Sequence, residues 1–236
     1  MLDFDSVTPK GEVIQYRNTG ELKGHPMKIF LVGKGGREAA MAWALTQDPA
    51  NEVFCAPGNA GIAEHATCVA IKEMDIDGLL RFARDNAIDL TIVGPEAPLV
   101  AGIADRFREA GLLICGPSAA AAQAEGSKAW FKELLRKHGL PTAYFQVFNG
   151  DPKEVLSYIE DCTPEAIVIK ADGLMGGKGV TLPDSLEEAE RDLKMFMVKG
   201  SPGETVVVED RLSGVERSVM AITDGKTVYM LPFTQD

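Results

Sequence analysis

Short apolar runs alternate with amphipathic stretches along the first half of the chain. Five runs have the length and composition of strands: residues 28–33, 52–56, 67–71, 90–94 and 112–116. Two sets of apolar residues recur at the spacing of a surface helix; they are Ile76, Leu79, Leu80 and Ala83, and Val100, Ile103, Ala104 and Phe107. Apolar strands separated by amphipathic helices predict an α/β unit with a parallel sheet covered on both faces. Ligands of such sheets bind beyond the carboxyl ends of the strands.

The hydrophobic pattern changes near Gly126. Helices are predicted to begin at three capped positions: Ser127, Asp151 followed by Pro152, and Ser185, which pairs with Glu188 in a capping box and opens a helix to about Met197. Further β-rich runs lie at residues 143–148, 166–171, 205–212, 216–223 and 227–234. The last three are joined by short turns, so we expect an α+β unit with antiparallel strands.

Residues 1–26 differ from the rest of the chain in their hydrophobic pattern, because they are polar and lack sustained periodicity. Met27 then leads directly into the first apolar run. Two interpretations stay open: an upstream extension with Met27 as the original initiator, or a docking arm whose partner the sequence does not specify. The predicted organisation is an extension over 1–26, a parallel-sheet domain over 27–126 and an α+β domain over 127–236.

Composition and charge narrow the function classes. The formal net charge is −11, which disfavours a nucleic-acid coat because phosphate neutralisation needs a basic face. No apolar run approaches the roughly 20 residues of a membrane span, and no signal peptide is visible. We therefore expect a cytoplasmic protein without nucleic-acid or membrane partners.

The cysteines and histidines do not suggest a metal centre. The four cysteines are scattered without CxxC spacing, which predicts buried thiols in a reducing compartment over disulfides or a zinc site; they are Cys55, Cys68, Cys115 and Cys162. The three histidines are scattered as well. No metal-binding residue is predicted in this chain.

The stretch GLMGGKG at residues 173–179 looks like a phosphate loop but fails both familiar patterns. A P-loop needs four residues between its glycines and a hydroxyl after the lysine, whereas the spacing to Gly177 is one residue short and Gly179 occupies the hydroxyl position. The earlier stretch GKGGRE carries Glu38 where a dinucleotide fingerprint has its third glycine. A carboxylate there would repel a pyrophosphate.

What remains is a flexible glycine loop with Lys170 at the preceding strand end and Lys178 inside it. Such a loop can close over a triphosphate, since glycine permits close backbone approach and the lysines neutralise charge. The alternative is a hairpin turn with two solvated lysines. The later run VVVEDRLSGVE favours the first interpretation, because a strand end at Glu209 can offer backbone groups to an adenine and a spaced carboxylate can accept from ribose hydroxyls.

The chain resembles the glycinamide ribonucleotide synthetase family of the ATP-grasp superfamily in seven stretches that occur in order: GKGGREAA, APGNAG, VGPEAPLVAGIAD, GPSAAAAQAEGSKAW, KADGLMGGKGV, VVEDRLSGVERS and PFTQD. The resemblance covers residues 27–236. It implies a Rossmann-like pre-ATP-grasp domain followed by an incomplete, C-terminally truncated ATP-grasp domain.

The resemblance also implies an activity. Such an enzyme ligates glycine to 5-phosphoribosylamine with ATP and Mg²⁺ through glycyl phosphate, in de novo purine biosynthesis. Its partners would be these small molecules, and we expect a monomer or a weak homodimer. The alternatives are another ATP-grasp carboxylate–amine ligase, such as a carboxylase or a formate-using purine ligase, and a non-catalytic nucleotide-binding module.

Residue roles follow from the same resemblance, position by position. The expected ATP-binding residues are Lys128, Lys170, Gly176, Gly177, Lys178, Glu209, Leu212 and Glu216, with Lys170 and Lys178 also catalytic. The residues expected around phosphoribosylamine are Gly35, Gly36, Arg37, Glu38, Asn59 and Glu96. Non-functional alternatives to these roles stay open for two residues. Lys128 could be a solvated surface charge, and Glu96 could be a structural helix cap.

Three departures from the family pattern matter. Ala39 stands where the family usually has histidine, and Met175-Gly176 replaces a commoner pair of alanines in the loop. The family continues for roughly as many residues beyond Asp236, and that part would carry the Mg²⁺ ligands. We therefore expect this chain to be an expressed fragment or an incomplete reading frame that is inactive alone.

Overall fold

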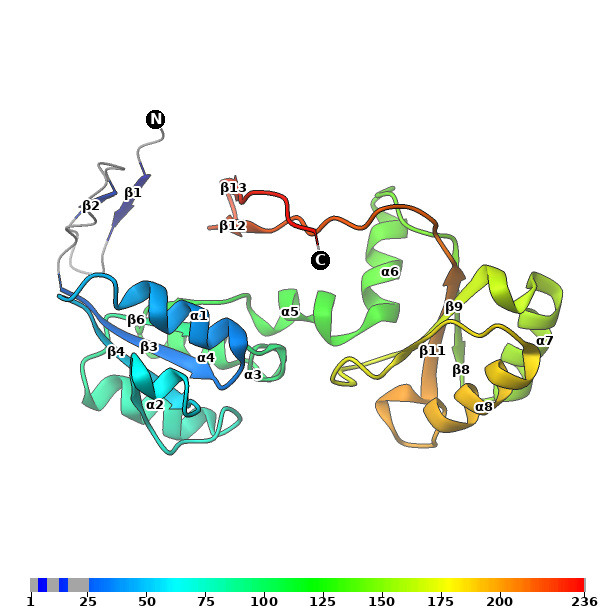
Figure 1. The fold of residues 1–236 in the computed structure, drawn as a ribbon, viewed down its shortest axis with the longest axis horizontal. Coiled ribbons are helices and arrows are strands. Elements are labelled where there is room, and N and C mark those ends of the chain that lie inside the picture. The colour runs from blue at the N-terminus through cyan, green and yellow to red at the C-terminus, as the bar shows by residue number, and fades with distance from the viewer. Residues whose placement is uncertain (1–3, 8–12, 17–25, 236) are drawn as a thin grey trace. The chain divides into compact units, whose positions relative to one another are not determined.

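The computed structural model describes residues 4–7, 13–16 and 26–235, which form two compact units (Figure 1). The first unit holds the described residues up to Leu134 together with Asp172–Gly177. The second holds Leu135–Ala171 and the described residues from Lys178 onward. The glycine-rich loop therefore belongs by its contacts to the first unit, although the strands on either side of it belong to the second. The domain boundaries predicted from the sequence stay a proposal.

A five-stranded sheet forms the centre of the first unit. Its strands are β3 (Lys28–Gly33), β4 (Glu52–Pro57), β5 (Thr67–Cys68), β6 (Leu90–Val93) and β7 (Ile114–Cys115). Their order is β5-β4-β3-β6-β7, and every neighbouring pair is parallel. The predicted parallel sheet is confirmed. Because the strand order changes direction at β3, the carboxyl ends of β3 and β6 flank the topological switch point where such folds bind ligands.

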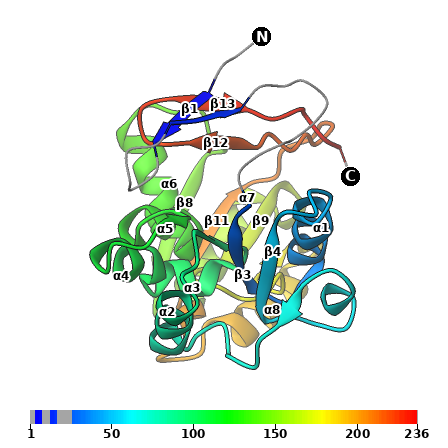
Figure 2. The same ribbon diagram turned by 90° about the vertical axis from the view of Figure 1, so that its left-hand side faces the viewer.

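Helices cover both faces of this sheet (Figure 2). On one face Ala42 packs with Ile29 and Leu31, and on the other Phe107 packs with Phe30 and Val32. Successive β3 residues thus face opposite cores, as strand geometry requires. The helices that follow the strands are α1 (Gly36–Leu45), α2 (Ile76–Asp85), α3 (Glu96–Val100), α4 (Ile103–Glu109), α5 (Ala119–Gly126) and α6 (Lys128–Lys137).

Three predictions for the first half were wrong in extent. The strand predicted over residues 112–116 is only the two-residue β7. The strand predicted over residues 67–71 is only the two-residue β5. The apolar stripe from Val100 to Phe107 is not one helix, because α3 ends at Val100 and α4 begins at Ile103. Gly102 between them has φ +87, a left-handed conformation that a helix interior does not contain.

The prediction of buried cysteines was wrong for two of the four. All four are free thiols, with Cys55 buried, Cys162 half-buried, and Cys68 and Cys115 exposed. Cys68 and Cys115 lie in β5 and β7, the two outermost strands of the sheet, so each of these strands pairs on one side alone among the residues that the structure describes. Their place at the sheet edges explains the exposure, which the local sequence does not encode.

The second unit contains an antiparallel sheet in the order β10-β9-β11-β8. Its strands are β8 (Phe145–Asn149), β9 (Ile167–Ala171), β10 (Val180–Thr181) and β11 (Thr205–Asp210). Two helices, α7 (Pro152–Cys162) and α8 (Leu186–Phe196), contact each other and bury Val155, Ile159, Leu193 and Phe196. The predicted α+β architecture with antiparallel strands is confirmed (Figure 1).

The predicted helix starts are largely confirmed. Ser127 Oγ accepts from Trp130 N at 3.1 Å, and Asp151 Oδ1 accepts from Lys153 N at 2.9 Å. Ser185 Oγ accepts from Glu188 N at 3.2 Å, but the carboxylate of Glu188 accepts from Asp184 N instead of Ser185 N. The second hydrogen bond of the predicted capping box therefore comes from the backbone of Asp184, the residue before the N-cap Ser185.

Two small hairpins complete the described chain. One pairs β1 (Phe4–Val7) with β2 (Val13–Tyr16), and the other pairs β12 (Ala221–Thr223) with β13 (Val228–Met230). The first was not predicted, and most of residues 1–26 lie outside the described residues, so both interpretations of that segment stay open. Three short 3₁₀ helices lie at Ile62–Glu64, Pro164–Ala166 and Pro202–Glu204. In the described part of the chain, no helix has the length and apolar character to cross a membrane.

Candidate functional site

The carboxyl end of β3 turns directly into α1, and Glu38 occupies the start of that helix. Its Oε2 accepts a hydrogen bond from Gly35 N at 2.6 Å, and the residue is only 3% exposed. A helix N-terminus attracts anions through its free N–H groups and its dipole. Here the chain's own carboxylate fills that position, so this turn is closed to a pyrophosphate, in agreement with the sequence argument.

Glycines at the ends of two neighbouring strands make room for this carboxylate. A Cβ at Gly33 would lie 2.6 Å from Glu38 Cδ, and a Cβ at Gly94 would overlap Glu38 Oε1. Among the described residues, Oε1 is buried and has no hydrogen-bond partner. The carboxyl ends of β3 and β6 therefore approach each other around Glu38, and any side chain at Gly94 would displace it.

Arg37 and Glu96 join the loops that follow β3 and β6. Arg37 Nη2 lies 2.9 Å from Glu96 Oε1, with both side chains more than a third exposed. The hydrogen bond that Arg37 donates to Glu96, and then the charge of Glu96, raise the pKa of Arg37 above the ordinary value. Burial pushes the pKa of Glu96 upward, but a backbone hydrogen bond and Arg37 outweigh it, so the net pKa is lowered. The pair stays charged and faces solvent at the switch point.

Asn59 connects the loops that follow β3 and β4. Its Nδ2 donates to Lys34 O at 2.7 Å, and its Oδ1 accepts from Ile62 N at 2.9 Å. Gly36 has open space where a side chain would stand. The six residues predicted to surround phosphoribosylamine thus lie in the loops and helix starts at the carboxyl edge of one sheet. Their roles toward a substrate stay predictions.

Lys170 and Glu209 form an ion pair on neighbouring strands of the second unit. Lys170 lies in β9 and Glu209 in β11, where the register pairs Val207 with Lys170 and Glu209 with Val168. The side chain of Glu209 is 6% exposed and that of Lys170 is 29% exposed. Glu209 therefore holds the lysine ammonium at the sheet while part of the lysine stays open to solvent.

The glycine-rich loop leaves β9 through a fixed turn. Ser127 Oγ donates to both carboxylate oxygens of Asp172, at 3.1 and 2.9 Å, and Lys128 Nζ donates to Gly173 O at 2.9 Å. Sequence reasoning assigned Lys128 to phosphate but missed this link between the start of α6 and the loop. The available signal was Asp172, a short acidic side chain directly after a strand.

Beyond this turn the loop carries its exposed lysine. Gly176 and Gly177 have φ of +59 and +80, conformations that glycine adopts without strain, and Lys178 is exposed. Leu212 and Glu216 follow β11 and are exposed, Leu212 at 75%. The side chain of Lys178 is therefore accessible to an anion.

Two family models match the chain, one after the other. The model described as phosphoribosylglycinamide synthetase, N domain, matches residues 27–125, and the model described as phosphoribosylglycinamide synthetase, ATP-grasp (A) domain, matches residues 126–236. The chain belongs to the phosphoribosylglycinamide synthetase family. The resemblance seen in the seven sequence stretches is thereby confirmed.

Curated relatives of this synthetase family carry the name phosphoribosylamine–glycine ligase. The protein of Clostridium acetobutylicum is 47% identical over 211 residues, and that of Haemophilus influenzae is 50% identical over 217 residues. These matches cover 88% and 89% of this chain but 50% of each relative. The chain thus spans about half the length of the curated relatives it matches.

Solved structures agree on the synthetase fold. The crystal structure of phosphoribosylamine–glycine ligase from Thermotoga maritima is 31% identical with a TM-score of 0.69, covering 87% of this chain and 49% of that one. Carboxyaminoimidazole ribonucleotide synthase from Aspergillus clavatus, solved in complex with ATP, has a TM-score of 0.67 at 19% identity, covering 89% of this chain and 54% of that one. The second likeness shows the fold alone.

The described residues do not themselves form a magnesium centre. Over residues 4–7, 13–16 and 26–235, no group of three or more His, Cys, Asp and Glu side chains is placed to hold a metal ion. The two buried carboxylates of the second unit are both engaged by side chains of this chain, Glu209 by Lys170 and Asp192 by Thr181. The described residues therefore supply no such cluster for Mg²⁺.

Proposed function

We propose that this chain supplies the phosphoribosylamine domain and the phosphate loop of an ATP-dependent ligase that joins glycine to 5-phosphoribosylamine. The observation that carries the proposal is the family match over residues 27–236 in both domains. Accessible lysines beside and inside a glycine-rich loop add support from the chain itself. A cytoplasmic location and a monomeric or weakly dimeric state stay predictions.

The chemistry of the proposed reaction explains why ATP is needed. A glycine carboxylate is a poor electrophile, so its oxygen first takes the γ-phosphoryl group of ATP, giving glycyl phosphate and ADP. The amine of phosphoribosylamine then attacks the carbonyl carbon, an amide bond forms, and phosphate leaves with one oxygen of the original carboxylate. Phosphoryl transfer requires mainly positioning and charge neutralisation.

The lysines suit the charge-neutralising task. Lys170 is held by Glu209 at a fixed position of the sheet yet stays partly accessible. Lys178 stands in a loop whose glycines allow close backbone approach to phosphate oxygens. We assign Lys170, Lys178 and Lys128 to the phosphates, with Gly176 and Gly177 shaping the loop.

We propose the remaining nucleotide contacts from the resemblance of the sequence to the same family. Glu209 and Leu212 lie at and beyond the end of β11, where we propose adenine binds, and Glu216 would accept from the ribose hydroxyls. Leu212 is largely exposed and offers an apolar surface to a base.

The phosphoribosylamine site would use the carboxyl edge of the parallel sheet. Arg37 suits the phosphate of the substrate, because its exposed pair with Glu96 is worth little and a phosphate can replace the carboxylate. Glu96, once released, can accept from the amine or a ribose hydroxyl. Asn59, Gly35 and Gly36 would shape the backbone around the sugar, and Glu38 would fix the turn from inside.

The proposal is tested in a chimaera in which residues 27–236 replace the matching half of the Haemophilus influenzae relative. The expected result is ADP release that depends on both glycine and phosphoribosylamine. A Lys170→Ala version serves as the matched control and should lose activity while keeping its circular-dichroism spectrum. A folded chimaera that releases no more ADP than the control would contradict the proposal and favour a non-catalytic nucleotide-binding module.

A further inference from the structure

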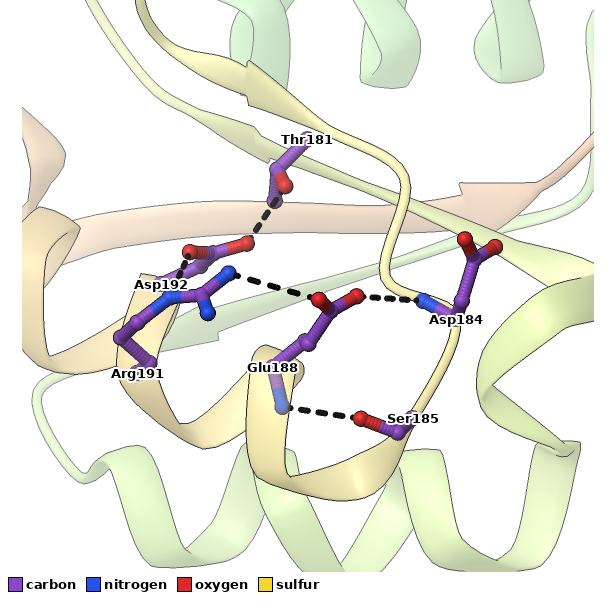
Figure 3. A network of polar contacts seen from close by, with 6 residues as sticks. All are labelled: Thr181, Asp184, Ser185, Glu188, Arg191 and Asp192. Carbon is purple, nitrogen blue, oxygen red and sulfur yellow. Dashed lines mark hydrogen bonds and ion pairs between the residues drawn. The ribbon is translucent and has the colours of Figure 1, made fainter.

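Thr181, just after the glycine-rich loop, is hydrogen-bonded to the buried carboxylate of Asp192 on α8 (Figure 3). Thr181 Oγ1 donates to Asp192 Oδ2 at 2.5 Å, and Asp192 is 7% exposed. The other carboxylate oxygen accepts from Arg191 Nε at 3.3 Å. A buried carboxylate is costly unless donors satisfy it. The Thr181 hydroxyl is the closer of the two donors, so this contact holds the backbone after the loop against the helix.

The helix that receives Thr181 is itself fixed. Leu193 and Phe196 of α8 are buried, and Glu188 accepts from Asp184 N at 3.0 Å. Arg191 Nη2 lies 3.8 Å from Glu188, which links the two polar contacts into one network (Figure 3). The chain between residues 181 and 184 is therefore attached to α8 at both ends.

The opposite end of the loop has its own attachment. Asp172 accepts from Ser127 Oγ, and the carbonyl of Gly173 accepts from Lys128 Nζ. Between the two attachments lie residues 174–179, which include the glycines with positive φ and the exposed Lys178. The positions of these attachments limit where the loop can bend.

The strand that Thr181 holds in place is short. β10 has two residues at the edge of its sheet, and within the described part of the chain it pairs with β9, where Val180 pairs with Lys170 and Thr181 with Ile169. Such a short edge strand opens easily. A side-chain contact to a buried carboxylate opposes that opening directly beside Lys170.

We propose that Thr181 is a positioning residue whose bond to Asp192 anchors the distal end of the glycine-rich loop. The anchor confines loop closure to residues 174–179 and keeps β10 paired with the strand that carries Lys170. The proposed anchor depends only on contacts within this chain and does not require the proposed function. Its consequence for nucleotide binding rests on the proposed function.

The anchor is tested by hydrogen exchange of the 236-residue chain without nucleotide. Thr181→Val keeps the side-chain shape but removes the donor, and Thr181→Ser restores the hydroxyl. We expect about tenfold faster exchange over residues 180–185 in the valine variant, the size of effect expected for losing a hydrogen bond to a charged group. The serine variant should exchange within about twofold of wild type. Glu190→Gln is the matched control, because it removes an exposed pair with Lys194 at 2.7 Å on the same helix.

Two results would overturn the anchor. One is unchanged exchange in the valine variant, and the other is a serine variant that exchanges as fast as the valine variant. If Thr181→Val does not fold, Asp192→Asn takes its place, since the amide oxygen still accepts from Thr181 but without charge. Exchange over residues 180–185 should then lie above wild type while exchange in α1 stays unchanged, and wild-type exchange would overturn the anchor.

A nucleotide-binding measurement separates this inference from the proposed function. The affinities of the wild-type chain and the Thr181→Val chain for ATP and AMP are compared. Because the proposed function places the loop at the triphosphate, the valine variant should lose ATP affinity more than AMP affinity. An unchanged ratio would overturn the positioning role. If the chimaera that carries the wild-type residues 27–236 binds neither nucleotide, the proposed function fails while hydrogen exchange still decides the anchor.

Discussion

A methyl group added at Gly94 should destabilise the first unit through Glu38. The Cβ of Gly94→Ala would overlap Glu38 Oε1, and Glu38 is buried between the ends of β3 and β6. The backbone of Gly94 is not in the left-handed region, so the carboxylate alone opposes the substitution. Overpacking costs about 1–3 kcal/mol and losing the cap contact costs about 0.5–2 kcal/mol. Together these terms predict a loss of about 1.5–5 kcal/mol in the free energy of unfolding.

The assay is urea unfolding of the 236-residue chain in a Trp130→Phe background. The chain has two tryptophans, so the remaining Trp43 on α1 reports the unit that contains Gly94. Gly36→Ala is the matched control, since nothing lies within 4 Å of its added Cβ. That control should be neutral or more stable by about 0.4–1 kcal/mol.

A double-mutant cycle tests the cause. Glu38→Ala alone should destabilise the unit because the Gly35 N–H loses its acceptor. Gly94→Ala added to Glu38→Ala should then cost at least about 1 kcal/mol less than it costs alone. Additive effects of the two substitutions would refute the claim that Glu38 is what the glycine accommodates, and a stable Gly94→Ala single variant would refute the packing around β6.

Three further predictions follow from the same contacts. Lys170→Ala in the chimaera should lower ADP release by about 10²-fold or more, measured in steady state, while Trp43 fluorescence stays native; equal turnover would end its assignment. Glu96→Gln should lower the free energy of unfolding by no more than about 1 kcal/mol near pH 7. Because the pKa of Glu96 is lowered in the folded protein, the difference between variant and wild type in urea unfolding should vanish as the pH falls from about 4.3 through that lower pKa. A difference that stays constant with pH would exclude the ion pair as its source. Burial, and next the charge of Cys68, raise the pKa of Cys55 to about 12, so iodoacetamide at pH 8 should alkylate the exposed Cys68 and Cys115 first in a peptide map, and early alkylation of Cys55 would contradict its burial.

The sequence predicted those helices and strands that are determined by a signal within their own residues. The apolar runs gave the strands β3, β4 and β6 because a buried parallel strand is apolar on both sides. Capping residues placed the starts of α6, α7 and α8 because a short polar side chain satisfies the free N–H groups of the first turn. Spacing also excluded a P-loop, which needs a fixed number of residues.

The sequence could not show contacts made between distant segments. The buried position of Glu38 depends on Gly94, 56 residues away in the chain, which brings a second strand end against it. The link from Ser127 to Asp172 and the link from Thr181 to Asp192 join elements through side chains whose local signals are those of ordinary caps and turns. The exposure of Cys68 and Cys115 follows from strand order, which composition does not contain.

The path of a carboxylate oxygen tests the central claim most directly. The chimaera is supplied with glycine labelled with ¹⁸O in both carboxylate oxygens, together with ATP and phosphoribosylamine, and the released phosphate is analysed by mass spectrometry. If glycyl phosphate forms and the amine attacks its carbonyl carbon, each phosphate carries one labelled oxygen. Phosphate without label, released at the same rate as ADP, would mean that ATP is hydrolysed without ligation and would contradict the account.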